Sequence, residues 1–346
     1  MSKLKLFTIV TCLSLTFSFA QKKDYKVTTV AFYNVENLFD TINDPKKNDE
    51  ASPIMEMRES IRGDVYIKKQ KNLANVIKRI GAELSQNAPA IVGLAEIENF
   101  DVLQDLVNEP KLKKYNYGIV HYDSPDERGI DVALLYQKGI FKPTHTGRKE
   151  LIMYRNGSST KRDYTRDQLY VKGLLDGDEI HFMVNHWPSR GSEEANRIKA
   201  AKSSRSVVDS VMSNDPNAKI MMMGDFNDGP YNKSITDHLH AKGKKRQVKS
   251  KELYNPFDKL FKRGIGTIAW RDTWDLFDQI MVSKSLITKD YSSYQMYKAG
   301  IYNANFLQTS EGRYKGYPFR SFADGGFTGG YSDHFPVYIH LIKEVD

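Results

Sequence analysis

The sequence predicts a single α/β domain with sheets in the middle and helices outside. Seven short apolar runs are rich in β-branched and aromatic residues and too short to be buried helices, which is typical of buried strands. Two longer stretches have the periodicity of amphipathic helices. The 346 residues show no internal repeat and no linker that would divide them, and this length suits one large α/β domain.

The first twenty residues have the features of a secretory signal peptide. A basic start precedes a mostly apolar run from Leu6 to Phe19, and "SFA", ending at Ala20, forms a cleavage site. We therefore expect residues 1–20 to be removed after Ala20 and the mature chain to be secreted or periplasmic, without a transmembrane anchor. The only cysteine, Cys12, lies in this segment, so the mature chain would have neither a disulfide nor a cysteine metal ligand.

The predicted elements alternate along the chain. After the first strand, residues 43–58 form an irregular polar loop. A first helix is predicted to bury Leu73, Val76, Ile77, Ile80 and Leu84 on one face. A second helix, over 193–212, is predicted to bury Ala195, Ile198, Ala201 and Val208. Asp176-Gly177 predicts a β-hairpin turn. The strands are predicted at 27–34, 90–96, 131–136, 179–187, 219–226, 277–283 and 335–342.

The positive charge is unevenly distributed. Loss of Lys3 and Lys5 with the leader lowers the formal net charge from +8 to +6. Residues 241–264 contain nine Lys or Arg and two acidic residues. Such a run is most often a solvated loop, but it is also typical of a surface that binds the phosphate backbone of nucleic acid. In the second case, neutralising residues 244–246 would weaken turnover of nucleic acid and leave small substrates unaffected.

Polar side chains stand at the ends of six predicted strands. A single one would usually be a turn former or a helix cap. Because loops at strand ends gather at one edge of a sheet, six such ends predict one pocket of carboxylates, amides and imidazoles. The residues are Asn34, Glu36, Glu96, Glu98, Asn185, His186, Asp225, Asn227, Asp228, Asp278, Asp333 and His334.

This set of side chains suits metal-assisted hydrolysis of a phosphate ester. Carboxylate and amide oxygens without thiolates favour Mg²⁺, with Mn²⁺ or Ca²⁺ as alternatives. An imidazole beside a carboxylate is held in one tautomer and stabilised when protonated. The sequence contains no Gly-rich nucleotide loop and no GxSxG elbow, so ATP-driven and serine-esterase chemistry lack support.

Seven motifs follow one another along the chain: "YNVENLFD", "LAEIEN", "RGIDVALLY", "VNHWPSR", "GDFND", "FDQIMVS" and "SDHFPV". In this order they resemble the motifs of the endonuclease/exonuclease/phosphatase superfamily, which includes DNase I. The resemblance spans Ala31 to Ile342 and implies a catalytic domain over residues 27–343. It further implies a four-layer α/β/β/α sandwich of the DNase I type, with the active site at one end of two central sheets, in a secreted bacterial member of the superfamily.

The resemblance also implies roles for individual residues. Glu96 would be the principal Mg²⁺ ligand, with Asn34 beside it, and Asp333 would assist with metal or water. Asp225 and Asn227 would hold the phosphate and the attacking water.

Two imidazoles complete the implied site. Asp278 would orient His334 by a hydrogen bond to Nδ1. His186 would protonate the leaving oxygen or bind the phosphate, with Asp123 as a candidate support. Arg128 would contact phosphate or, alternatively, pair with a surface carboxylate.

Two classes of substrate remain open. The first is DNA or RNA, cut by an extracellular or periplasmic endonuclease in which Arg128 and Asn185 bind the substrate. The alternative is a phosphodiesterase or phosphatase on a small molecule or lipid headgroup, as in sphingomyelinases. Trp270 and Trp274 would then form a stacking wall or a membrane contact, unless they belong to the core. The intact polar set argues against a binding protein without catalysis, and nothing in the sequence indicates an obligate protein partner.

Overall fold

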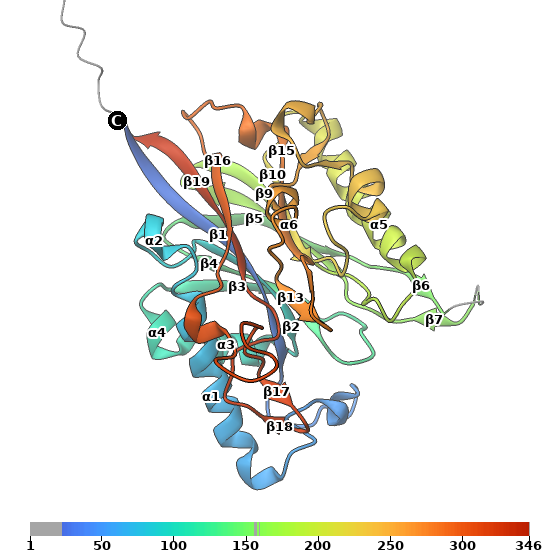
Figure 1. Ribbon diagram of the computed structural model, residues 1–346. Coiled ribbons are helices and arrows are strands. Elements are labelled where there is room, and N and C mark those ends of the chain that lie inside the picture. The colour runs from blue at the N-terminus through green and yellow to red at the C-terminus, as the bar shows by residue number, and fades with distance from the viewer. Residues whose placement is uncertain (1–22, 156–157, 159, 346) are drawn as a thin grey trace, which may run out of the picture.

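Two β-sheets pack face to face between layers of helices (Figure 1). The computed structural model describes residues 23–345 except 156, 157 and 159. One sheet has the strand order β16-β19-β1-β2-β4-β3, and the other has the order β11-β12-β15-β10-β9-β8-β5. The predicted four-layer sandwich is therefore confirmed. The predicted signal peptide, residues 1–20, lies outside the described residues.

The strands and helices have the following bounds. The first sheet contains β1 (Asp24–Leu38), β2 (Ile91–Ile97), β3 (Tyr117–His121), β4 (Asp131–Gln137), β16 (Gln295–Ile301) and β19 (Val337–Val345). The second contains β5 (Phe141–Lys149), β8 (Gln168–Leu175), β9 (Asp178–His186), β10 (Ile220–Asp225), β11 (Ala241–Lys242), β12 (Leu253–Tyr254) and β15 (Asp278–Ser283). Short hairpins are formed by β6 (Met153–Tyr154) with β7 (Arg162–Asp163), β13 (Ile268–Trp270) with β14 (Thr273–Asp275), and β17 (Phe322–Ala323) with β18 (Gly326–Phe327). The helices are α1 (Glu59–Ile77), α2 (Ala82–Ser85), α3 (Phe100–Asn108), α4 (Pro110–Lys113), α5 (Glu194–Asn214) and α6 (Phe257–Phe261).

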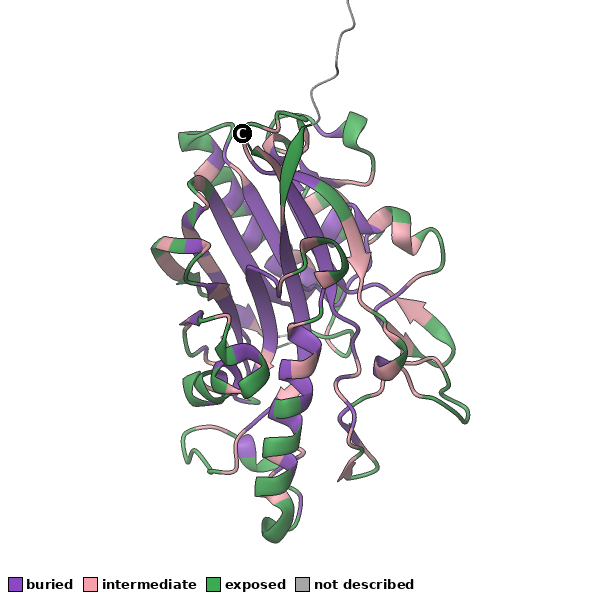
Figure 2. Ribbon diagram, turned by 90° about the vertical axis from the view of Figure 1, so that its left-hand side faces the viewer, coloured by how far each residue is buried: buried purple, intermediate pink, exposed green. Residues whose placement is uncertain are grey.

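Three apolar layers hold the sandwich together, and the central strands are buried along most of their length (Figure 2). Phe32, Phe182 and Met223 belong to the core between the sheets. A Cβ atom on Gly93 would lie 2.5 Å from Met223 Sδ, so this glycine permits the close approach of the two sheets. Helices α1 and α3 cover one sheet and α5 covers the other. None of the described helices is long and apolar enough to cross a bilayer.

All seven predicted strands are present, and the predicted hairpin turn joins β8 to β9, with positive φ at Asp176 and Gly177. The helix predictions are wrong in part. Helix α1 ends at Ile77, and Leu84 is exposed in the separate helix α2, which follows Gly81 with its φ of +66°. Ala195 is exposed because the first turn of α5 instead buries polar residues.

The strand directions bring the predicted polar ends together. Strands β1 and β2 run parallel, as do β9 and β10, and all four finish at the same end of the sandwich. Strand β15 is antiparallel to β10 and pairs Asp278 with Asp225. Strand β19 is antiparallel to β1 and starts with Val337 opposite Phe32, so the residues just before β19 lie beside the end of β1. This shared end lies opposite the C-terminus in Figure 1.

Candidate active site

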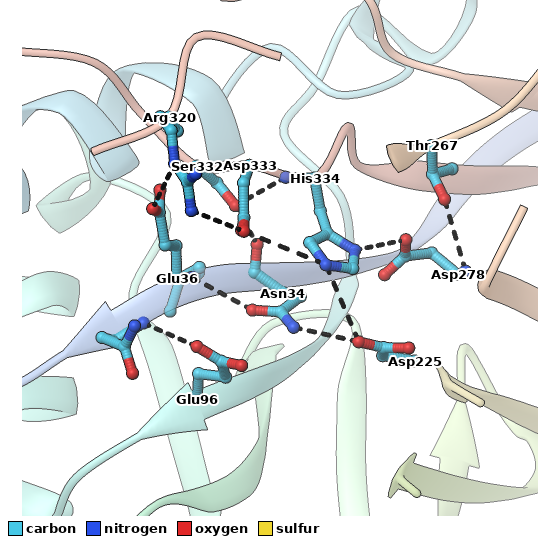
Figure 3. A network of polar contacts seen from close by, with 12 residues as sticks. Asn34, Glu36, Glu96, Asp225, Thr267, Asp278, Arg320, Ser332, Asp333 and His334 are labelled. Carbon is cyan, nitrogen blue, oxygen red and sulfur yellow. Dashed lines mark hydrogen bonds and ion pairs between the residues drawn. The ribbon is translucent and has the colours of Figure 1, made fainter. Parts of the chain in front are cut away.

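Side chains from the ends of β1, β2 and β10, from the start of β15 and from the residues before β19 converge at this end of the two sheets (Figure 3). Two of the contributing strands are irregular there. Pairing of β1 with β2 shifts register after Asn34, and Glu36 and Asn37 have φ near +50°. Glu96 has a φ of +65° within an irregularity of β2 against β4. Such bulges re-aim side chains at the rims of sheets.

Glu96 is held with one carboxylate oxygen free to act as a ligand. Its Oε2 accepts the backbone N–H of Asn37 at 2.9 Å, whereas Oε1 lies 4.0 Å from His186 Nε2, beyond hydrogen-bonding distance. Arg128 places a guanidinium nitrogen 3.7 Å from Oε2 and donates to Asn37 Oδ1 at 2.6 Å. Arg128 is thus beside the predicted metal ligand, where its charge also suits a phosphate.

Asp225 lies at the centre of the cluster. Asn34 donates to its Oδ2 at 3.1 Å, and the backbone N–H of Asn227 donates to Oδ1 at 2.9 Å. Burial and the neighbouring Asp278 carboxylate raise the pKa of Asp225 to about 6. A carboxylate with such a pKa is ionised at neutral pH yet remains a competent proton acceptor.

His334 is paired as predicted. Its Nδ1 lies 2.7 Å from Asp278 Oδ2, and its Nε2 faces Asp225 Oδ2 at 3.8 Å and Asp333 Oδ1 at 4.0 Å. Burial lowers the pKa of His334, but the Asp278 carboxylate outweighs it and raises this pKa well above the usual value.

A bend before β19 lets Asp333 and His334 both reach the site. Ser332 fixes this bend, because its hydroxyl donates to the Asn34 carbonyl at 2.7 Å and accepts the N–H of His334 at 3.0 Å.

His186 lies at the back of the site. Its Nε2 is 3.7 Å from Asp225 Oδ2, and the imidazole is buried. Burial and the nearby Arg166 hold its pKa well below the usual value, so it is neutral at pH 7. The expected support by Asp123 is wrong: Nδ1 of His186 has no partner among the described residues, and Asp123 is exposed.

Sequence reasoning missed Arg166, which shares a hydrogen-bond acceptor with Asn227. Arg166 is buried, pairs with Asp126 at 3.1 Å and donates to the Trp187 carbonyl at 2.6 Å. The side-chain amide of Asn227 donates to the same carbonyl at 2.9 Å. Residues 162–166 resemble a surface segment in sequence, so nothing there signalled this contact.

A second missed group surrounds Asp333. Arg320 lies 3.3 Å from both Glu36 Oε1 and Asp333 Oδ2. The backbone N–H of Ser321 also donates to Glu36, and Lys69, buried in α1, donates to Ser321 Oγ at 2.7 Å. Glu36 is therefore occupied in holding the loop that carries Arg320, and burial raises its pKa to about 7.

The structure does not bring Asn185 to the site, so its predicted contact with substrate is wrong. Successive residues of a strand face opposite sides, and His186 takes the side toward the site. Asn185 instead accepts from Trp187 Nε1 at 3.2 Å and Ser204 Oγ at 2.9 Å, and donates to the Met223 carbonyl at 3.2 Å.

Asn185→Ala is therefore expected to act on stability. It leaves two buried donors and a carbonyl unpaired, which costs about 1–3 kcal/mol for each group not rescued by water. Thermal unfolding should occur at a lower temperature, while KM should stay unchanged. A selective rise in KM without a loss of stability would contradict this assignment.

Residues 244–251 of the basic stretch lie away from the site. Strand β15 starts at the site with Asp278, and β12 pairs with its far end through Leu253–Ser283 and Tyr254–Val282. Residues 244–251 lead into β12 at that end, and Lys245 lies over Tyr254, the partner of Val282, at 5.6 Å. The structure therefore gives no support to a contact between residues 244–246 and a phosphate at the site.

The oxygen donors at the site fit a hard divalent cation. Glu96 Oε1 and Asp225 Oδ2 flank the same His186 nitrogen at 4.0 and 3.7 Å, and the Asn34 amide adjoins Asp225. Carboxylate and amide oxygens in this arrangement suit Mg²⁺ or Mn²⁺. Asp225, Asp278 and His334 also lie close enough to share an ion, but the short His334–Asp278 bond makes a proton-managing pair the better description.

A second cluster contains His121, Asp123 and Asp131. His121 Nε2 lies 3.0 Å from Asp131, whose other oxygen accepts the N–H of Ser124 at 2.8 Å. These bonds pin the loop that carries Arg128, and they satisfy the buried carboxylate without a metal.

Comparison with solved structures finds the same fold elsewhere. An endonuclease/exonuclease/phosphatase family protein from Bacteroides thetaiotaomicron is 18% identical, with 93% of this chain and 100% of that chain covered and a TM-score of 0.57. A mannosyl-6-phosphatase from the same organism is 18% identical, with coverage of 91% and 99% and a TM-score of 0.54. D. rerio TDP2 in complex with a single-strand DNA product is 14% identical, with coverage of 91% and 98% and a TM-score of 0.51.

The sequence has no match among curated proteins. The model of the endonuclease/exonuclease/phosphatase family, in contrast, matches residues 29–343, which include all the site residues described above. The chain therefore belongs to the endonuclease/exonuclease/phosphatase family.

Proposed function

We propose that this protein is a metal-dependent hydrolase of phosphodiester bonds, acting as an endonuclease on DNA or RNA outside the cytoplasm. The observation that carries the chemistry is the His334–Asp278 pair, with a 2.7 Å bond on one side of the imidazole and the carboxylates of the site on the other. The family match supports phosphate-ester hydrolysis, and the signal-like leader supports export.

The chain supplies the proton chemistry. His334, kept protonated by Asp278, would present Nε2–H to a phosphoryl oxygen and stabilise the charge that develops there. Asp225 would accept the proton of an attacking water that Asn227 helps to orient. Arg128 would bind a non-bridging oxygen beside Glu96. His186, neutral and buried, would donate a hydrogen bond toward the leaving oxygen.

A divalent cation, Mg²⁺ before Mn²⁺ or Ca²⁺, would be held by Glu96 and Asn34 with help from Asp333. When bound, it would polarise the phosphoryl group and neutralise its charge.

A second candidate function is hydrolysis of a small phosphate ester. A hollow of about 300 Å³ opens beside the site and is lined by Asn37, Glu56, Arg320 and Gly326, among others. Its volume and polar lining suit a small hydroxylated leaving group. Of the solved structures that share the fold, one is a mannosyl-6-phosphatase and another is TDP2 with a bound single-strand DNA product, so the fold accommodates both types of ligand.

A substrate panel with and without Mg²⁺ tests the proposal. It contains plasmid DNA, single-stranded DNA, RNA, bis-p-nitrophenyl phosphate, p-nitrophenyl phosphate, a hexose phosphate and sphingomyelin. We expect turnover of the phosphodiesters, with nucleic acid preferred at low salt and declining steeply as salt rises. Exclusive turnover of the hexose phosphate, or of sphingomyelin, would contradict the nuclease proposal and favour the second candidate.

Because Lys245 lies over Tyr254, beside the end of β15 that is far from Asp278, neutralising Lys244, Lys245 and Arg246 together should change the turnover of nucleic acid by less than about threefold. A solvated loop that is remote from the reacting phosphate affects binding of the nucleic acid only through long-range electrostatic attraction, which salt screens. The salt dependence of plasmid nicking, compared with wild type, is the measurement. A marked loss restricted to nucleic acid would show that this loop does contact the substrate.

A further inference from the structure

An exposed tyrosine stands next to the site. Tyr231 follows Asn227 by four residues and is 51% exposed. Its ring stacks on Phe261 with the centroids 4.9 Å apart. A Cβ atom on Gly229 would lie 2.6 Å from this ring, so the glycine allows the ring to adopt its position. One face of Tyr231 is thus supported by protein, and about half of the residue is open to solvent.

Arg190 connects this tyrosine to the site. Its Nε donates to the Asn227 carbonyl at 3.3 Å, and another nitrogen lies 3.4 Å from the Tyr231 hydroxyl. The guanidinium also lies 4.4 Å from the centroid of Phe277, the residue before Asp278. A cation and an exposed aromatic face are therefore held together at the edge of the catalytic cluster.

The β13–β14 hairpin carries a second exposed ring and contacts Arg190. Asp275 of this hairpin pairs with Arg190 at 3.1 Å. The sequence predicted that the two tryptophans form either a stacking wall or part of the core, and the structure shows one of each. Trp274 stacks against Phe335, the residue after His334, whereas Trp270 is 70% exposed. Arg271 lies over Trp270 at 5.6 Å.

We propose that Tyr231 and Trp270 form a stacking subsite for the bases of single-stranded nucleic acid, with Arg190 and Arg271 facing its phosphates. This inference rests on the proposed function and specifies its substrate. Exposed rings next to cations are the combination that binds single strands, because every base offers a π-face once it leaves a duplex. Arg190 contacts both Tyr231 and the Asn227 carbonyl. A nucleic-acid strand stacked on Tyr231 would therefore run next to the phosphate that is hydrolysed.

Nucleic acid fits this rim better than a membrane does. Both exposed rings are accompanied by arginine, and the nearby Tyr314 is likewise 57% exposed with Arg313 at 5.9 Å. No exposed large aliphatic side chain accompanies these rings among the described residues of 227–231, 268–275 and 312–317. A surface that inserts into lipid would present aliphatic side chains in a contiguous patch with its aromatic ones.

The test measures binding separately from cleavage. In a His334→Ala background with Mg²⁺ present, fluorescence anisotropy compares a labelled single strand of about 12 nucleotides, within the usual range of site sizes, with a base-free strand of the same length. Tyr231→Ala and Trp270→Ala should each weaken binding of the normal strand by about 5- to 150-fold. The base-free strand should bind weakly and be insensitive to both substitutions.

The matched controls separate stacking from structure. Tyr231→Phe and Trp270→Phe keep a ring and should bind as the parent does. Tyr297→Ala removes an equally exposed tyrosine, 58% accessible on the edge strand β16, and should have no effect. Melting temperatures establish that each variant is folded.

Binding of anionic phosphatidylserine vesicles is measured for the same variants. Three results would overturn the inference: both alanine variants bind the normal strand as the parent does, they lose equal affinity for the normal and the base-free strand, or they lose affinity for the vesicles alone. Hydrolysis of bis-p-nitrophenyl phosphate by the wild type is measured in parallel. Its absence would refute the proposed function, whereas the anisotropy series alone decides the stacking subsite.

Discussion

Glu96→Gln is expected to lower Mg²⁺-dependent hydrolysis of bis-p-nitrophenyl phosphate by roughly a hundredfold or more. The substitution replaces the carboxylate whose unbonded oxygen would bind the cation by a neutral amide. The substitution keeps the size of the side chain and its acceptor for the N–H of Asn37, which is 2.9 Å away in the wild type. High Mg²⁺ should restore activity only in part.

Glu98→Gln is the matched control. Glu98 lies two residues along the chain, is buried and accepts the N–H of Asp40 at 2.6 Å. Burial raises its pKa to about 8, so the wild-type side chain is largely neutral at pH 7 and the amide changes little. Equal losses of activity for the two variants would contradict the role of Glu96 as a ligand and indicate a general effect of charge.

The second large effect is expected at the imidazole pair. His334→Ala should lower kcat by roughly 10²–10⁴, the scale for a positioned proton-transfer group. Asp278→Asn should have a comparable or milder effect, because it removes the charge that keeps His334 protonated. Since the two side chains act as one unit across their 2.7 Å bond, the double variant should be little worse than His334→Ala alone.

The measurement is a double-mutant cycle on kcat, with His145→Ala, an exposed histidine of β5, as the control that retains activity. Fully additive losses would show that Asp278 and His334 act independently. A comparable loss in His145→Ala would show that the assay reports on something other than the site.

The sequence predicted most of this site because its residues stand in short motifs at the ends of apolar strands. Asn34, Glu96, Asp225 and His334 each follow or precede a run whose burial could be recognised from composition alone. Asn185 shows the limit of that argument: it occupies the same motif as His186, but the alternation of a regular strand turns it toward α5. The bulges at Glu36 and Glu96 had no signal in the sequence, since neither is glycine.

Residues missed from the sequence act from segments distant along the chain. Lys69 projects from the middle of a helix, and Arg166 and Arg320 stand in irregular stretches without a motif. Their roles depend on the packing of loops against the sheet ends, which a single sequence does not specify. The same holds for the basic stretch at 244–251, whose composition suggested a phosphate contact although its strand pairing places it at the opposite end.

The central claim is that a divalent cation and the Glu96–His334 cluster together hydrolyse phosphate esters. The most direct test is the rate of bis-p-nitrophenyl phosphate hydrolysis by the protein after treatment with EDTA, and again after Mg²⁺ is restored in excess. We predict that EDTA abolishes the rate, that Mg²⁺ restores it in the wild type, and that the Glu96→Gln variant recovers little of it. Hydrolysis that persists undiminished in EDTA would contradict the account.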